Sequence, residues 1–228
     1  MSIESAKYPR TPHLPFSPGA TSDDKMLSSV DHFLGVSIVL TEKMDGSNLC
    51  MTKEAVFARS HNGPPTHESF NLAKQLHASI RHSIPDGLSV FGEYLFAVHS
   101  IAYTDLPGYF LIFGVREDLT GKWWSWEMVE EMAKDLGCPT VPVLCKTGEG
   151  KDLENYKTPE MLKASVGFFA ATTSMCNLGR RESEGIVIRL AGEFTDFSMS
   201  VAKYVRANHV TTTQHWQQKQ VERNRTRG

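Results

Sequence analysis

A chain of 228 residues is long enough for one well-buried domain or at most two small ones, and its 40% hydrophobic and 22% charged residues exclude the disordered and fibrous classes. The formal net charge of −2 indicates that any nucleic-acid surface would be a local patch rather than a global field. The four scattered cysteines have no zinc-type spacing, and no stretch resembles a transmembrane segment or a signal peptide, so we expect an intracellular, cytoplasmic protein without a membrane partner.

The predicted elements, in chain order, begin with an irregular N-terminal arm over residues 1–30, where prolines remove backbone donors. Seven strand-like runs rich in β-branched and aromatic residues follow, at 36–43, 48–52, 55–60, 88–96, 109–117, 184–190 and 200–206. Helical patterns lie between these runs, at 68–83, at 125–137 after a Ser125 cap, and from a Thr158 cap onward. Strands in runs with helices inserted predict a single α+β domain, residues 1–228, with largely antiparallel sheets and flanking helices. A basic tail over 207–228 ends the chain.

The first strand ends in "TEKMDGSN", which places Glu42, Lys43 and Asp45 where the chain leaves the strand. Taken alone, the pattern is that of a hairpin turn with a surface lysine, because Asp-Gly is a frequent short hairpin signal. The probability that a chain of this length contains a K-x-D-G match by chance is roughly a few per cent. The significance of the motif therefore depends on the residues that accompany it.

Later strands carry further groups that a phosphoryl-transfer site could use. Each has a structural alternative: an ion-paired carboxylate, a core phenylalanine or a solvent-facing lysine. Because charges are rarely buried without a partner or a function, their joint occurrence in strands favours a site. The groups are Arg59 for a phosphate or terminal hydroxyl, Glu93 within an apolar strand, Phe113 as an aromatic face for a base, Glu184 at the start of an apolar strand, and Lys203 and Arg206 in the last strand.

These residues resemble a known set of motifs. Lys43-Met44-Asp45-Gly46, Glu93, Phe113, Glu184-Gly185-Ile186-Val187 and Lys203 look like motifs I, III, IIIa, IV and V of the covalent nucleotidyltransferases, the superfamily of ATP-dependent ligases and mRNA capping enzymes, in the family's order. Asn48 stands where DNA ligases and capping enzymes usually carry arginine, and "ARSHNG" resembles an element of ligases similar to RNA ligase 2. The resemblance therefore implies the nucleotidyltransferase fold, of the ATP-grasp-like type found in ligase adenylation domains, and an ATP-dependent RNA ligase.

The resemblance also implies the chemistry. Lys43 would attack the α-phosphate of ATP, hold AMP as a phosphoramidate and pass it to an RNA 5'-phosphate, from which a 3'-hydroxyl displaces it. Because an attacking amine must be neutral, we expect Lys203 and a bound divalent cation to disfavour its ammonium form, while Asp45 positions it. The cofactors are ATP and Mg²⁺, with Mn²⁺ able to substitute. The remaining roles are Glu93 and Glu184 for the metal or ribose, Lys203 for the α-phosphate, Phe113 for the adenine face, Glu42 for the adenine amino group, and Asn48 and Arg59 elsewhere in the nucleotide site.

Two features depart from the family pattern. Val205 stands where a second motif V lysine is usual, so Arg206 would substitute for it or phosphate contact would be weaker. The chain ends about twenty residues after motif V, so we expect no appended OB-fold, a monomer, and an RNA grip from the chain's own termini or from a partner protein. The predicted RNA contacts are Arg206, Lys219, Arg223 and Arg225.

Two alternatives to an RNA ligase remain. One is another lysyl-nucleotide transferase, a DNA ligase or a capping-type guanylyltransferase. The other is a nucleic-acid-binding module that performs no chemistry, although such a module has no use for Lys43, Glu184 and Lys203 together.

Overall fold

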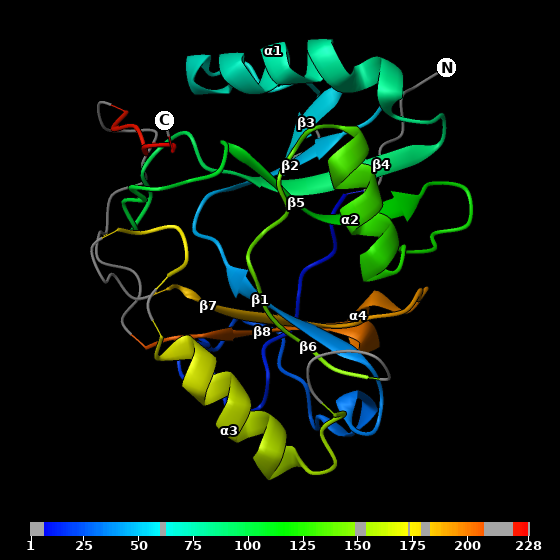
Figure 1. The fold of residues 1–228 in the computed structure, drawn as a ribbon, viewed down its shortest axis with the longest axis vertical. Coiled ribbons are helices and arrows are strands. Elements are labelled where there is room, and N and C mark those ends of the chain that lie inside the picture. The colour runs from blue at the N-terminus through cyan, green and yellow to red at the C-terminus, as the bar shows by residue number, and fades with distance from the viewer. Residues whose placement is uncertain are drawn as a thin grey trace.

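The structure is a computed structural model that describes residues 7–59, 63–148, 154–172, 174–178, 183–207 and 221–227. Two antiparallel four-stranded sheets lie one above the other, with helices on their outer sides (Figure 1). The predicted α+β class, with antiparallel sheets and flanking helices, is confirmed.

Sheet A, the lower sheet in Figure 1, has the strand order β6-β1-β7-β8. Its strands are β1 (Ile38–Lys43), β6 (Val143–Lys146), β7 (Gly185–Leu190) and β8 (Val201–Val205). Sheet B has the order β3-β2-β4-β5, with β2 (Ser47–Met51), β3 (Val56–Ala58), β4 (Leu88–Tyr94) and β5 (Phe110–Glu117). All seven predicted strands occur. The prediction missed β6, because four residues are too few to show a periodic pattern.

Helices α1 (Asn71–Ile80) and α2 (Trp126–Asp135) pack on sheet B, and α3 (Pro159–Ala170) packs on sheet A (Figure 1). The predicted caps form: the Ser125 hydroxyl accepts from the Met128 N–H at 3.3 Å, and the Thr158 hydroxyl accepts from the Met161 N–H at 3.3 Å. The shorter elements are the one-turn α4 (Phe197–Ser200) and 3₁₀ turns at Asp31–Phe33, Glu68–Phe70 and Arg81–Ser83.

Alternation along the strands divides the core into three layers, because neighbouring side chains point to opposite faces of a sheet. The outer face of sheet B packs on α1 and α2, and the outer face of sheet A packs on α3. An aromatic layer lies between the inner faces, made of Cys50, Phe57, Phe91, Trp123, Phe194, Phe197 and Val201. The candidate functional site shares this inner layer.

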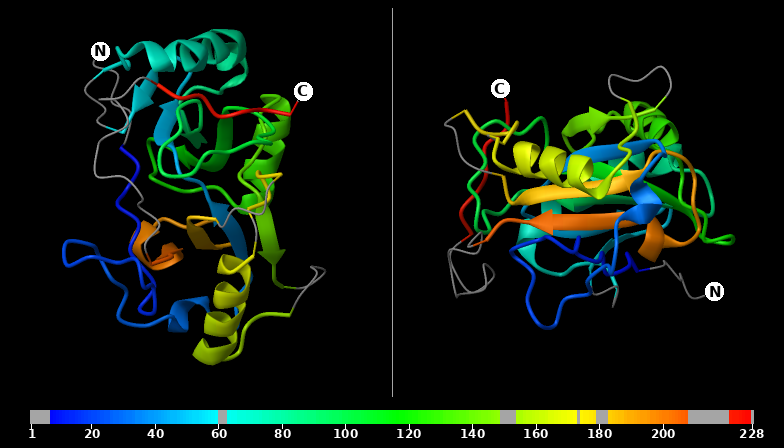
Figure 2. Two further views of the ribbon diagram at one scale, coloured as in Figure 1. Left: turned by 90° about the vertical axis from the view of Figure 1, so that its left-hand side faces the viewer. Right: turned by 90° about the horizontal axis from the view of Figure 1, so that it is seen from below.

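The N-terminal arm runs beside β8 at the edge of sheet A (Figure 2). No helix or strand element falls within residues 7–30, but the arm is tied to β8 by backbone hydrogen bonds. The Leu14 N–H donates to the Lys203 carbonyl at 2.8 Å, and the Lys203 N–H donates to the Pro12 carbonyl at 2.9 Å. The arm therefore reaches the strand that carries a predicted site residue.

The described part of the C-terminal tail, residues 221–227, packs along the segment that follows β4 (Figure 2). Asn224 is 2% exposed, and its side-chain amide donates to the Leu95 and Ala97 carbonyls and accepts from the Tyr103 N–H. This stretch is thus part of the folded domain.

Candidate active site

A cavity of about 1230 Å³ opens between the inner faces of the two sheets. Because β1, β7 and β8 present alternate residues to this side, Thr41, Lys43, Val187 and Lys203 all line it. Seven of the predicted site residues line the cavity, namely Glu42, Lys43, Asn48, Arg59, Glu93, Phe113 and Lys203.

The register of sheet A gathers the charged residues that are far apart in sequence. Lys43, the last residue of β1, is opposite Gly185 of β7, and Val187 is opposite Lys203 of β8. Glu184 directly precedes β7, and its Oε2 lies 2.7 Å from the Lys43 Nζ. The Lys43 side chain is 23% exposed and that of Glu184 is 8% exposed, so water screens the pair little, and Lys43 lines the cavity.

The protein's own groups hold Lys43 in its ammonium form. Burial alone would lower the pKa of Lys43, but the carboxylates of Glu184, Glu93 and Asp45 outweigh burial and raise that pKa. Burial, followed by the repulsion of Lys43, lowers the pKa of Lys203. The expected depression of the nucleophile's pKa therefore does not come from the amino acids alone.

Three acidic side chains, Glu93, Glu184 and Asp45, gather around Lys43. Burial raises the pKa of Glu93 to about 8, and the nearby carboxylates Glu184 and Asp45 add to the rise in spite of Lys43. The Glu93 Oε1 accepts from the Gly46 N–H at 3.1 Å, which ties β4 to the turn after Lys43. Such a cluster is suited to a further cation.

Asp45 and Glu42 hold neighbouring loops. The Asp45 Oδ2 accepts from the Ser100 and Ile101 N–H groups at 2.7 and 2.9 Å. The Glu42 carboxylate accepts from the Ser174 hydroxyl and from the Met175 N–H. Both carboxylates therefore accept hydrogen bonds from neighbouring loops, of which the Asp45 loop lines the cavity through Ser100.

Two glycines of the motifs stand where a side chain would collide with backbone. A methyl group at Gly46 would lie 2.7 Å from the Tyr94 carbonyl oxygen. One at Gly185 would lie 2.9 Å from the Tyr204 carbonyl carbon and closer still to its oxygen. Close approach of strands explains the glycine in both "KMDG" and "SEG".

The apolar side of the cavity has an aromatic wall. Phe113 lines it, and the Phe113 carbonyl accepts from the buried Arg189 guanidinium at 3.2 Å. The ring of Tyr8, from the N-terminal arm, lies 5.0 Å from that of Phe113 at an interplanar angle of 68°. The buried Asn48 Oδ1 has no hydrogen-bond partner among the described residues, which suits it to a ligand in the cavity.

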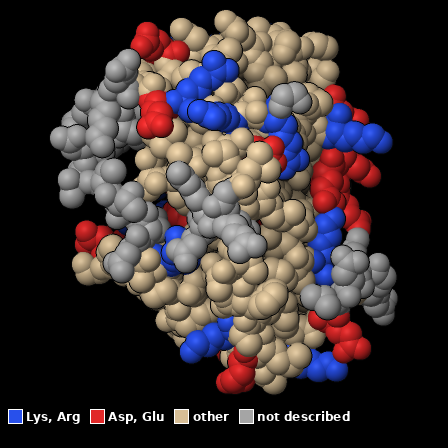
Figure 3. Space-filling model, turned by 60° about the vertical axis from the view of Figure 1, so that its left-hand side comes forward, with Lys and Arg blue, Asp and Glu red and all other residues tan. Residues whose placement is uncertain are grey.

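Three of the four predicted RNA contacts, Arg206, Arg223 and Arg225, are not among the residues that line the cavity. The Arg206 Nε donates to the Ser183 carbonyl at 2.7 Å, and the Arg223 guanidinium lies over the rings of Phe96 and Tyr109. Arg225 belongs to the docked C-terminal stretch, and Lys219 lies outside the described residues. On the face in Figure 3, basic side chains are interspersed with acidic ones, as the net charge of −2 would lead one to expect.

The predicted metal ligands are two carboxylates. Within the part of the chain that the structure describes, no group of three or more His, Cys, Asp or Glu side chains is arranged to hold a metal ion. Glu93 and Glu184 nevertheless fit Mg²⁺, because this ion commonly binds through one or two carboxylates together with substrate phosphates and water.

Several residues of the site were not predicted from the sequence. Arg189 is buried, and its place in the apolar run "GIVIRL" is the same signal that marked Glu93. Tyr8 and Asp24 of the arm also line the cavity. No local pattern marks these two, because only the docking of the arm brings them to the site.

The fold and the site together define a protein with a large cavity between two antiparallel sheets and a lysine among the residues that line it. The family model for RNA ligase matches residues 36–205, so the chain belongs to the RNA ligase family, as its motifs led us to expect. None of the helices in the described part of the chain has the length and apolar character needed to span a bilayer.

Solved structures share the fold. An RNA ligase mutant of Naegleria gruberi with ATP and Mn is similar at a TM-score of 0.56 and 17% identity, over 79% of this chain and 53% of that one. An archaeal ATP-dependent RNA ligase is similar at a TM-score of 0.57 and 17% identity, over 90% of this chain and 50% of that one. The chain thus spans about half the length of these relatives. A sequence search among curated proteins finds no match.

Proposed function

We propose that the chain is an ATP-dependent RNA ligase that joins a 5'-phosphate to a 3'-hydroxyl through a lysyl-AMP at Lys43. The observation that carries this proposal is the partly open Lys43 ammonium in the cavity, with the Glu184 carboxylate at 2.7 Å and with Lys203 on β8, the strand on the far side of β7. Membership in the RNA ligase family supports it, as do similar structures of ligases named with ATP and Mn.

In the first step, the neutral Lys43 Nζ attacks the α-phosphorus of ATP. An N–P bond forms, the P–O bond to the leaving pyrophosphate breaks, and the lysine proton passes to solvent. The 5'-phosphate of the RNA then attacks the same phosphorus, and the N–P bond to Lys43 breaks. In the last step the 3'-hydroxyl loses its proton and attacks the RNA 5'-phosphorus, and AMP leaves as the phosphodiester forms. Since the protein does little covalent chemistry beyond the lysine, its other residues position the phosphates and neutralise their charge.

The charges around Lys43 assign the supporting roles. Glu93 and Glu184 would hold Mg²⁺, which supplies positive charge at the phosphates and offsets the carboxylates that keep Lys43 protonated. Lys203 would bind the α-phosphate. Phe113 would pack on the adenine, and Asn48 would meet a polar group of the nucleotide.

The sealing test uses four nicked or broken substrates, with RNA or DNA on each side of the junction, at low and moderate salt. We expect ribonucleotides to matter most on the 3'-hydroxyl side, because the 2'-hydroxyl can be sensed only close to the reacting end. We also expect binding to weaken with salt, because phosphate contacts release counterions. Equal rates on the all-DNA substrate would instead assign the chain to the DNA ligase branch, and labelling by GTP in place of ATP would favour a capping-type transferase.

Two variants test the roles of the site residues: Glu184→Ala and Lys203→Ala should lose most sealing activity while remaining folded. Lys53→Ala is the control, since Lys53 pairs with Asp86 at the surface, 39% exposed, and does not line the cavity. Wild-type sealing by both site variants would return Glu184 and Lys203 to purely structural roles.

A further inference from the structure

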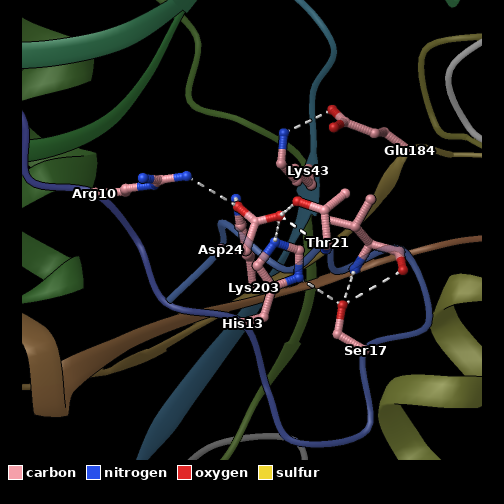
Figure 4. Close-up of polar contacts among 9 residues, drawn as sticks. Arg10, His13, Ser17, Thr21, Asp24, Lys43, Glu184 and Lys203 are labelled. Atoms are coloured by element: carbon pink, nitrogen blue, oxygen red, sulfur yellow. Dashed lines mark hydrogen bonds and ion pairs between the residues drawn. The ribbon is translucent and has the colours of Figure 1, made fainter. Parts of the chain in front are cut away.

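The N-terminal arm brings a carboxylate, Asp24, to the cavity, where Lys203, Arg10 and His13 lie around it (Figure 4). The Lys203 Nζ lies 3.9 Å from the Asp24 Oδ1, and an Arg10 nitrogen lies 3.5 Å from the same oxygen. On the other side, the His13 Nε2 lies 3.5 Å from the Asp24 Oδ2. No sequence motif led us to expect this cluster.

The Asp24 carboxylate is held in one place. Its Oδ2 accepts from the Thr21 N–H at 3.1 Å and from the Thr21 hydroxyl at 2.9 Å. Led by the backbone hydrogen bond from Thr21, these contacts lower the pKa of Asp24 to about 2, so the group is ionised at neutral pH.

The backbone next to Asp24 is anchored to sheet A. The His13 N–H donates to the Lys25 carbonyl at 2.7 Å, and the Leu27 N–H donates to the His13 carbonyl at 2.8 Å. Residues 12 and 14 in turn hydrogen-bond to the backbone of Lys203 itself. Two sets of backbone hydrogen bonds therefore connect the Asp24 segment to Lys203, one to residue 13 of the arm and one from residues 12 and 14 to β8. The connection is short and rigid.

Two properties of Lys203 make a fixed partner for its ammonium group important. Its side chain is a flexible four-carbon stem, and the Lys43 ammonium repels its charge. The pair with Asp24 is 21% and 17% exposed, so water screens it less than a surface ion pair. Asp24 therefore stabilises the charged Lys203 and holds its ammonium group on the arm side of the cavity.

We propose that Asp24 is a positioning residue for Lys203 in the adenylylation step, holding the ammonium charged and in place until the α-phosphate of ATP binds it. The inference rests on the proposed function, in which Lys203 contacts that phosphate. It makes the N-terminal arm a part of the active site.

Two substitutions separate positioning by charge from a structural role in the arm. Asp24→Asn keeps a short acceptor for the Thr21 turn but removes the charge, whereas Asp24→Glu keeps the charge and disturbs the turn. Asp23→Asn is the control, because Asp23 is the exposed neighbour and its change alters net charge equally. For each variant, the formation of the protein–AMP adduct is followed in single turnover across ATP concentrations, with thermal unfolding measured in parallel.

We expect Asp24→Asn to lower the maximal rate by about tenfold or more, with a smaller change in the half-saturating ATP concentration, because misplacement of a contact to the reacting phosphate acts on the chemical step. Asp24→Glu should retain more of the rate than Asp24→Asn, and Asp23→Asn should stay within about twofold of wild type.

Three outcomes are distinct. A wild-type rate in Asp24→Asn would refute the inference. A higher rate in Asp24→Asn than in Asp24→Glu would assign Asp24 to the turn alone. Failure of the wild-type chain to form any adduct would instead overturn the proposed function.

Discussion

Replacing Gly185 by alanine should damage both stability and chemistry. Gly185 sits opposite Val205 in the β7–β8 pair and directly follows Glu184. An added methyl group would lie 3.1 Å from the Val205 Cα, 2.9 Å from the Tyr204 carbonyl carbon and closer again to the Tyr204 oxygen. These neighbours are backbone atoms, so no side-chain rotation relieves the collision.

Relief requires β8 to shift by about 1 Å from β7, and overpacking of this kind costs about 1–3 kcal/mol in the free energy of unfolding. The same shift moves Lys203 relative to Lys43, and a displacement of about 1 Å at reacting groups can cost roughly 100-fold in rate. We therefore expect adduct formation to fall further than the loss of stability alone would produce.

The assay pairs urea unfolding with single-turnover formation of the protein–AMP adduct at a temperature where the variant remains folded. Gly192→Ala is the matched control, because a methyl group there meets nothing within 4 Å. It should change the free energy of unfolding by less than about 0.5 kcal/mol. Wild-type stability and adduct formation in Gly185→Ala would refute the close-approach explanation of the motif glycine.

Two further expectations concern the terminal segments. Asn224→Ala should lower the free energy of unfolding by about 2 kcal/mol or more, because the Leu95 and Ala97 carbonyls and the Tyr103 N–H lose their partner. An unaltered midpoint of urea unfolding would mean that residues 221–227 are not docked. Burial and then the Lys203 charge lower the pKa of His13 to about 4, below the unfolded value of about 6.5. The contribution of neutral His13 to the free energy of unfolding is therefore present above pH 6.5 and is lost as the pH falls toward 4. His13→Gln should remove at most about 3 kcal/mol of that acid-dependent loss. If the free energy of unfolding fell equally with pH in the wild type and the variant, His13 would not be its cause.

The sequence predicts those parts of the site that local patterns mark. Lys43 follows an apolar run and precedes Asp-Gly, and Glu93 is a charge inside an apolar strand, so both are visible without a structure. The helix caps at Ser125 and Thr158 are local in the same way, and both form.

Features that depend on tertiary contacts were not predictable from the same patterns. Asp24 lies in "TSDDKM", which has the composition of an ordinary polar loop, and only the pairing of the arm with β8 brings it to Lys203. The balance of charge around Lys43 also depends on distances across three strands, so the direction of its pKa shift follows from the register rather than from the motif.

The role of Lys43 as nucleophile is tested by the intact mass of the wild-type chain after incubation with ATP and Mg²⁺, followed by peptide mapping of any adduct. We expect the addition of a single AMP on Lys43, absent from Lys43→Ala and retained in the surface control Lys53→Ala. An adduct that persists in Lys43→Ala, or a wild-type chain that gains no AMP, would contradict the assignment of Lys43 as the nucleophile.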